Sequence, residues 1–294
     1  WALSYPMRLF FKLLFLSITC LSGMGTQFLS LPMTARDLAL GANPMLNQNG
    51  LWNPALLQSN ATGSEINFSY GKGMGDLELS ALGFTSPKGV LTRGLKFRYA
   101  GLSDLELRED KPQTNPLAYF SANGMAMDMT LAFAFGQQHF GITMRWIEMS
   151  LYMEKSHGLA MDFGYWRQIL QKGKLGFSIL NLGKMSPFIS ENPSLPLRVL
   201  GGISWASNFS SFSNAFYTSL EYAHLPKVGI VNIGDEIAWK NLLFQVSGKW
   251  AEENQALSAG FGLKQGLLGF QYGVQLSSQN LGLSHLFDFY ILLP

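Results

Sequence analysis

The sequence predicts an all-β protein: a transmembrane antiparallel β-barrel of about fourteen strands, with an N-terminal segment folded into its lumen. Apolar and small or polar residues alternate in fourteen short stretches between Ile66 and Leu292. A period of two is typical of a strand with two different faces. Only 14% of the 294 residues are charged, against roughly 25% in ordinary soluble domains. A secretion signal precedes the alternating stretches, which agrees with a barrel in a bacterial outer membrane.

Residues 1–25 are predicted to be upstream residues followed by a signal peptide. The expected start is Met7, so residues 1–6 would precede it. Arg8 and Lys12 supply the positive region, residues 13–21 the apolar region, and cleavage is expected after Gly25. The alternative is an uncleaved membrane anchor, but the apolar run is short for a membrane-spanning helix.

The next segment, residues 26–64, lacks the strand pattern and is predicted to be a luminal plug. Thr34 is suited to cap a short helix and Gly41 to end it. The pair Asn53-Pro54 predicts a turn, because the residue before proline disfavours helical conformation.

Three residues of this segment are expected to fix the plug: Arg36, Asn53 and Pro54. Arg36 would do so by pairing with a wall carboxylate such as Asp162 or Glu221. Ordinary capping and turn formation is the alternative for all three.

The barrel is predicted to occupy residues 65–294. The predicted strands are 66–70, 76–85, 94–102, 126–135, 140–149, 158–166, 175–181, 198–205, 216–222, 232–239, 243–250, 257–264, 267–275 and 285–292. Connections after even-numbered strands are mostly short and the others mostly longer, as in outer-membrane barrels with short periplasmic turns and longer external loops. This parity predicts external loops at 103–125 and 182–197 and places both termini in the periplasm.

Charged residues within the strands are expected to face the lumen. Arg145, Asp162 and Glu221 each lie between apolar neighbours, and a charge on the lipid face of a barrel is costly. Glycines recur within the strands as well, which indicates a curved wall.

No catalytic, cofactor-binding or metal-binding residue is expected. The four histidines lie in separate segments without a partner at metal-ligand spacing, and the only cysteine, Cys20, lies in the signal. A formal charge of +2 without a basic run excludes nucleic acid as a partner. Glu106 and Arg108 in one loop, and Phe188 and Ile189 in another, are the candidates for binding a protein partner.

The segment 28–42, with Leu31-Pro32, Ala35-Arg36 and Ala39-Leu40-Gly41, resembles the start of mature PorV/PorQ family outer-membrane proteins. Trp52-Asn53-Pro54-Ala55 matches the Asn-Pro-Ala that follows in the family. Further matches at 70–81, 158–165, 175–182, 196–203 and 281–285 extend the likeness over nearly the whole mature chain. The chain departs from the family in having Ala42 directly after Gly41, and in ending without an aromatic residue.

The resemblance implies a FadL-like barrel of fourteen strands with an N-terminal segment in the lumen. It implies a non-enzymatic role in type IX protein secretion or surface attachment of cargo. The implied partners are the secretion translocon, cargo C-terminal signal domains or surface attachment proteins, besides outer-membrane lipid. The first alternative is a FadL-like channel for hydrophobic small molecules, which would require an apolar luminal pocket and a gap or kink in the wall; the second is a mainly structural role.

Overall fold

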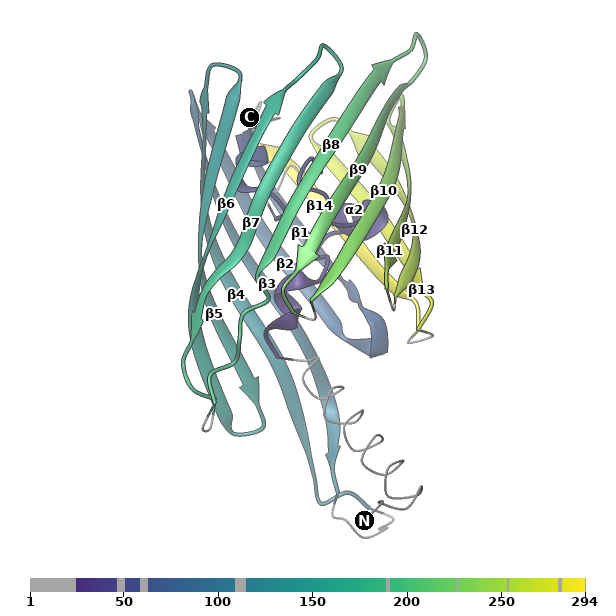
Figure 1. Ribbon diagram of the computed structural model, residues 1–294. Coiled ribbons are helices and arrows are strands. Elements are labelled where there is room, and N and C mark those ends of the chain that lie inside the picture. Colours follow the sequence, from purple (N-terminus) through teal and green to yellow (C-terminus); the bar gives the residue numbers. More distant parts are fainter. Residues whose placement is uncertain are drawn as a thin grey trace, which may run out of the picture.

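The computed structural model describes residues 25–46, 51–58, 63–108, 115–188, 191–225, 227–252, 254–279 and 282–293. They form a closed barrel of fourteen antiparallel strands, in which β1 pairs with both β2 and β14 (Figure 1). The strands are β1 (Ser64–Lys72), β2 (Glu78–Lys88), β3 (Leu91–Leu107), β4 (Ala118–Phe135), β5 (Gln138–Leu151), β6 (Glu154–Gln168), β7 (Gly173–Met185), β8 (Arg198–Asn208), β9 (Ser213–Ala223), β10 (Val228–Trp239), β11 (Leu242–Ala251), β12 (Gln255–Gln265), β13 (Leu268–Ser277) and β14 (Ser284–Leu293). All fourteen predicted strands are confirmed. The predicted signal peptide lies outside the described residues, apart from Gly25.

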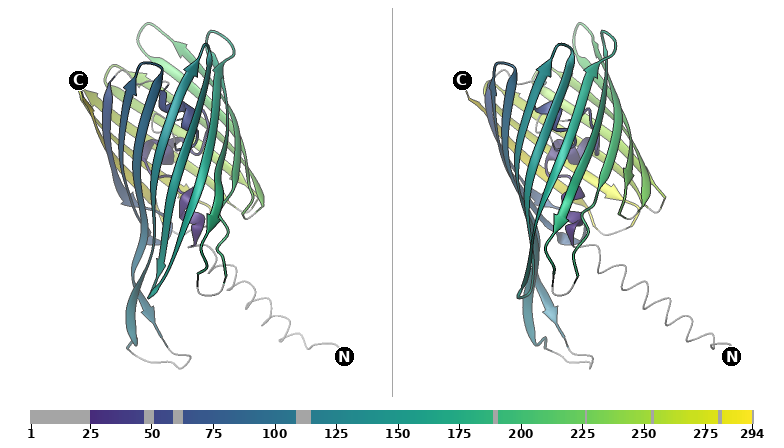
Figure 2. Two further views of the ribbon diagram at one scale, coloured as in Figure 1. Left: turned by 90° about the vertical axis from the view of Figure 1, so that its left-hand side faces the viewer. Right: turned by 60° about the vertical axis from the view of Figure 1, so that its left-hand side comes forward.

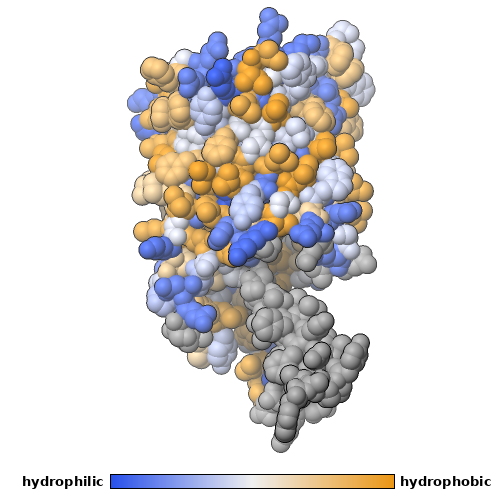
Figure 3. All heavy atoms as spheres, in the orientation of Figure 1, coloured by the Kyte–Doolittle hydropathy of each residue, from blue (hydrophilic) through white to orange (hydrophobic). Residues whose placement is uncertain are grey.

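Alternation along the strands separates an apolar outer face from a mixed inner face. In β4, Met129 and Leu131 are exposed to 59% and 46%, whereas Asp128, Thr130 and Ala132 between and beside them are buried. Hydrophobic residues gather across the middle of the face shown in Figure 3, with hydrophilic residues toward its two ends. Such an outer surface is typical of a barrel surrounded by lipid.

The two ends of the barrel differ in their connections. One end, called here the short-turn end, carries the connections after even-numbered strands, such as residues 89–90 and 136–137. The opposite long-loop end carries the connections 108–117 and 186–197. The predicted loop 103–125 is shorter than expected because β3 and β4 continue beyond the barrel as a hairpin (Figure 2). The β5–β6 connection is also short, at residues 152–153, because both strands run further than the alternation indicated.

Three short helical segments lie inside the barrel: η1 (Thr26–Ser30), α2 (Ala35–Leu40) and η2 (Pro54–Gln58). As predicted, Thr34 caps α2, since its side chain accepts a hydrogen bond from Asp37 N at 3.0 Å, and Gly41 ends the helix with φ of 75°. Leu38 and Trp52 are each only 1% exposed. The core of the molecule therefore lies between the segment 26–58, called here the plug, and the inner face of the wall. None of the helices in the described ranges is long and apolar enough to cross a membrane.

The plug follows the inner wall around the barrel, on a track of glycine residues. A Cβ on Gly164 would overlap Asn53, and one on Gly141 would overlap the backbone at Pro54 and Ala55. The further contacts of this kind are Gly273 with Ala35, Gly260 with Ala39, Gly234 with Leu40, Gly202 with Asn43 and Pro44, Gly176 with Met45, and Gly94 with Leu57. These glycines do more than ease curvature, because they make room for the backbone and side chains of the plug.

The described chain begins and ends at opposite ends of the barrel. Thr26 lies at the long-loop end, where its hydroxyl donates a hydrogen bond to Ser194 O at 2.5 Å. Leu293 lies at the short-turn end, paired with Ser64 (Figure 2). The prediction that both termini share the periplasmic side is therefore wrong for the described ends, because the plug runs the length of the lumen before β1 begins.

Candidate functional site

A ladder of alternating charges crosses the inner face of four neighbouring strands. Arg145 on β5 contacts Asp128 on β4 at 2.7 Å and Asp162 on β6 at 2.6 Å. Arg98 on β3 adds a second cation 3.2 Å from Asp128. All four side chains are at most 5% exposed. The predicted luminal position of Arg145 and Asp162 is confirmed, and each buried charge has a partner of opposite sign.

The ladder ends at Asn181 on β7. The Asn181 backbone N–H donates to Asp162 Oδ1 at 2.6 Å, and Arg145 donates to Asn181 Oδ1. The Asn181 side-chain amide donates in turn to Pro196 O at 2.9 Å. Asn181 has a φ of 63°, a left-handed conformation that asparagine tolerates better than most residues. At this point the pairing between β6 and β7 shifts register, so β7 bends.

The pairing that joins β7 to β8 stops directly beyond Asn181, at a place called here the break, which lies level with the turn between β9 and β10 because Arg198 also pairs with Ala223. Pairing between β7 and β8 extends from Gly173–Trp205 to Leu180–Arg198 and stops there. The rest of β7, up to Met185, faces the irregular segment 191–197 instead of a strand. A cavity of about 390 Å³ occupies this break, and its lining includes Leu182, Met185, Pro193, Leu195 and Leu197.

A second, separate ion pair lies on the other side of the break. Arg198 at the start of β8 donates to both Glu221 oxygens, at 2.5 and 2.7 Å. Its guanidinium also lies over the ring of Trp52 in the plug, 4.6 Å from the centroid. Glu221 faces the lumen as predicted. The break is thus flanked by buried charges on both sides, and the apolar plug lies behind it.

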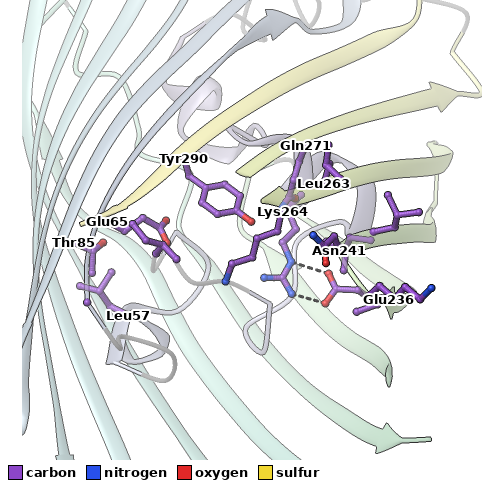
Figure 4. Close-up of a pocket in the computed structure, with 17 residues that line it drawn as sticks. Leu57, Glu65, Thr85, Glu236, Asn241, Leu263, Lys264, Gln271 and Tyr290 are labelled. Carbon is purple, nitrogen blue, oxygen red and sulfur yellow. Dashed lines mark hydrogen bonds and ion pairs between the residues drawn. The ribbon is translucent and has the colours of Figure 1, made fainter. Parts of the chain in front are cut away.

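A pocket of about 270 Å³ lies at the short-turn end, between the plug and strands β1, β2 and β10 to β14. Arg36 donates to both oxygens of Glu236 on β10, at 2.8 and 3.0 Å. Figure 4 shows Lys264 and Tyr290 pointing into the same pocket, with Glu65 at its far side. Burial alone would lower the pKa of Arg36, but the Glu236 carboxylate more than offsets it, so the guanidinium stays charged.

The structure places the three predicted plug residues inside the barrel. Arg36 pairs with a wall carboxylate, but the partner is Glu236 and neither Asp162 nor Glu221. The Asn53 amide donates to Pro44 O at 2.9 Å and to Tyr165 O at 3.0 Å, which links the plug to itself and to β6. Pro54 begins η2.

The candidates for partner binding lie at the long-loop end. Glu106 and Arg108 pair with each other at 2.7 Å on the β3–β4 hairpin, with side chains 43% and 44% exposed. Phe188 lies on the β7–β8 connection, where it bridges to Glu191. Ile189 lies outside the described residues. The structure therefore brings together the first two candidates.

The sequence analysis missed Arg98, Asp128 and Asn181. Asp128 lies inside the predicted strand 126–135 at an inward position, and Asp128 and Arg145 pair directly in the register of β4 and β5. Aligning the strands by register would have found this pair. Within the described ranges, no group of three or more His, Cys, Asp and Glu side chains is arranged to hold a metal ion.

No protein-family model matches the sequence, and no curated protein matches it either. Solved structures are similar. The toluene transporter TodX of Pseudomonas putida matches with a TM-score of 0.62 and 12% identity, covering 88% of this chain and 96% of TodX. The chain has the fold of TodX and FadL. A Pseudomonas aeruginosa FadL homologue matches with a TM-score of 0.54 and 8% identity, covering 88% of this chain and 98% of the homologue. The fold implied by the resemblance is thus confirmed, whereas membership of the PorV/PorQ family stays a prediction.

Proposed function

We propose that this chain is an outer-membrane channel for hydrophobic small molecules, and that the break between β7 and β8 is its opening toward the lipid. The break is the observation that carries the proposal. A continuous wall would confine solutes to the two aqueous ends, whereas unpaired strand edges do not ordinarily face hydrocarbon. Here the unpaired end of β7 is covered, among the described residues, by the segment 191–197.

The lining of the break suits an apolar solute. Leu182, 52% exposed, lies on the outer side, while Met185 and Leu195 are at most 7% exposed and belong to the same core as Trp52 of the plug. An apolar molecule leaving the membrane would therefore exchange lipid contacts for contacts with these side chains.

Passage requires the segment 191–197 or the plug to shift, because the core side chains behind the break are buried. Hydrogen bonds from Thr26 to Ser194 and from Asn181 to Pro196 hold the segment, and the His224 N–H donates to Leu197 O at its end beside β8. A typical hydrogen bond contributes about 1 kcal/mol. Displacing the segment would break these bonds and expose Leu195, but it would separate no paired strands.

The proposed orientation puts the long-loop end outside the cell and the short-turn end in the periplasm, as in other outer-membrane barrels. The break then opens into the outer half of the membrane. The similar solved structures support this function through their fold alone. One of them, TodX, is described as a toluene transporter. The secretion role implied by the PorV/PorQ resemblance has no comparable support in the contacts of the described residues. We therefore propose a channel.

Uptake of radiolabelled naphthalene by Gram-negative cells without a similar channel tests the proposal. Cells that produce the protein should take up naphthalene faster than cells with an empty vector, and uptake of a small sugar should not differ. Lys184→Trp, which places a large side chain in the lining of the break, should slow naphthalene uptake severalfold. Lys72→Trp, at the same end but outside the break, is the matched control.

Asn181→Gly keeps the left-handed backbone accessible but removes the side-chain bonds to Arg145 and Pro196. It should speed naphthalene uptake. Uptake equal to the empty vector, from a barrel shown to be inserted by its shift in gel mobility on heating, would reject the channel. Equal slowing by Lys184→Trp and Lys72→Trp would reject the break as its opening.

A further inference from the structure

The outer surface of β4 to β7 carries a row of four aromatic side chains. They lie side by side because Phe133 pairs with Phe140, Phe140 with Tyr165, and Tyr165 with Phe177. The ring centroids of the first two pairs are 5.6 and 5.3 Å apart. These strands form the wall turned toward the viewer in the left view of Figure 2.

A groove of about 420 Å³ lies beside this row on the lipid-facing surface. Its other boundary is the next outward row, formed by Ile142, Phe163 and Ile179. Phe163 is 41% exposed and Phe177 45%, so the groove is open toward the membrane. An unfilled hollow in the hydrocarbon region would forfeit dispersion contacts, so an acyl chain is the natural occupant.

One edge of the groove is basic. Arg167 follows Tyr165 on the outward face of β6, about 7 Å further toward the short-turn end, and is exposed. Lys172 lies exposed in the adjoining β6–β7 turn. The described residues 135–138, 166–175 and 204–212, which form this part of the short-turn end, include no Asp or Glu. A phosphate at this edge would thus meet cations and no competing carboxylate.

We propose that the groove and its basic edge bind one glycerophospholipid of the surrounding membrane. An acyl chain lies between the two outward rows, and the phosphate contacts Arg167. The distance along β6 from Phe163 to Arg167 matches a lipid that has its head group at the membrane surface and its chain directed toward the middle of the bilayer. This site is independent of the break at β7–β8 and of any transported solute.

Titration of the full-length purified barrel with phosphatidylglycerol in detergent, followed by native mass spectrometry, tests the proposal. The wild type should bind one lipid saturably. Arg167→Gln should weaken binding about fivefold, the effect expected of one cation near a lipid phosphate. Ile142→Trp should weaken it further by filling the groove. Arg93→Gln, an exposed cation on the outward face of β3, one strand beyond those that line the groove and three strands from Arg167, should bind like the wild type.

A neutral diacylglycerol should bind wild type and Arg167→Gln equally, because it lacks the phosphate. Three results would overturn the proposal: no saturable adduct, equal weakening by Arg167→Gln and Arg93→Gln, or a preference for lipopolysaccharide over phosphatidylglycerol. The heat-dependent gel shift verifies that each variant is folded. Arg167 and Arg93 are both exposed, so these two variants stay informative if Ile142→Trp does not fold.

Discussion

The barrel has two seams that close in different ways. Where β1 meets β14, pairing runs without interruption from Ser64–Leu293 to Lys72–His285. Where β7 meets β8, pairing stops at Leu180–Arg198, although β7 continues to Met185. The first seam is held along its whole length by backbone hydrogen bonds, and the second is completed by side chains.

The inner faces of the wall beside the two seams also differ in the side chains that they present. Near the complete seam, Gly273 and Gly260 make room for α2, and Asp288 on β14 accepts a hydrogen bond from Ala35 N at 2.8 Å. Near the interrupted seam, the wall presents the charge ladder that ends at Asn181. The glycine track supports the plug near both seams, and the charge ladder additionally braces the interrupted one. A wall braced by side chains can open locally without unpairing a strand.

The largest effect is expected from Arg145→Met. This change leaves Asp128 and Asp162 buried without their shared cation, and breaking a buried ion pair in this way costs about 3–5 kcal/mol. The melting temperature, followed by the heat-dependent gel shift, should fall strongly. Arg145→Met combined with Asp162→Asn should recover part of the loss, because Asp128 keeps Arg98 as its cation. An unchanged melting temperature in the single variant would show that the ladder does not brace the β7–β8 seam.

A smaller effect is expected from Arg36→Ala, which acts on the plug beside the other half of the wall. Glu236 would lose its cation, but both side chains are partly exposed, at 17% and 12%. Water therefore compensates in part, and the loss should be about 2–3 kcal/mol. Planar-bilayer recordings should show a raised single-channel conductance as the plug loosens. Unchanged conductance together with unchanged thermal stability would exclude Arg36 as a fastening of the plug.

The fold was predictable because alternation is a local property of the chain. Each strand shows its two faces within a few residues, so all fourteen were found without knowledge of their partners. The length of the β3–β4 hairpin was underestimated because both faces of its strands meet water beyond the membrane. Leu107 and Tyr119, for example, are both exposed. The alternation therefore fades where the strands still continue.

The contacts of the plug were less predictable because they depend on its height in the lumen. Asp162, Glu221 and Glu236 all lie on the inner face, and nothing local to Arg36 selects among them. Asn181 was missed for a related reason. Its role depends on the bend of β7 and on Pro196 of the following loop, which the sequence places in separate elements.

The smallest of the three effects comes from a pair of neighbouring glycines on β8, next to the interrupted seam. A Cβ on Gly202 would lie 2.8 Å from Asn43 Oδ1 and 2.9 Å from Pro44 Cδ, whereas one on Gly201 would meet nothing within 4 Å. Gly202→Ala should therefore push the plug away and cost about 1–2 kcal/mol, while Gly201→Ala should change stability by less than about 0.5 kcal/mol. The two variants differ only in the face of the wall that receives the methyl group. Equal melting temperatures would mean that the plug does not rest on the glycine track at β8, and that the break is not backed by it.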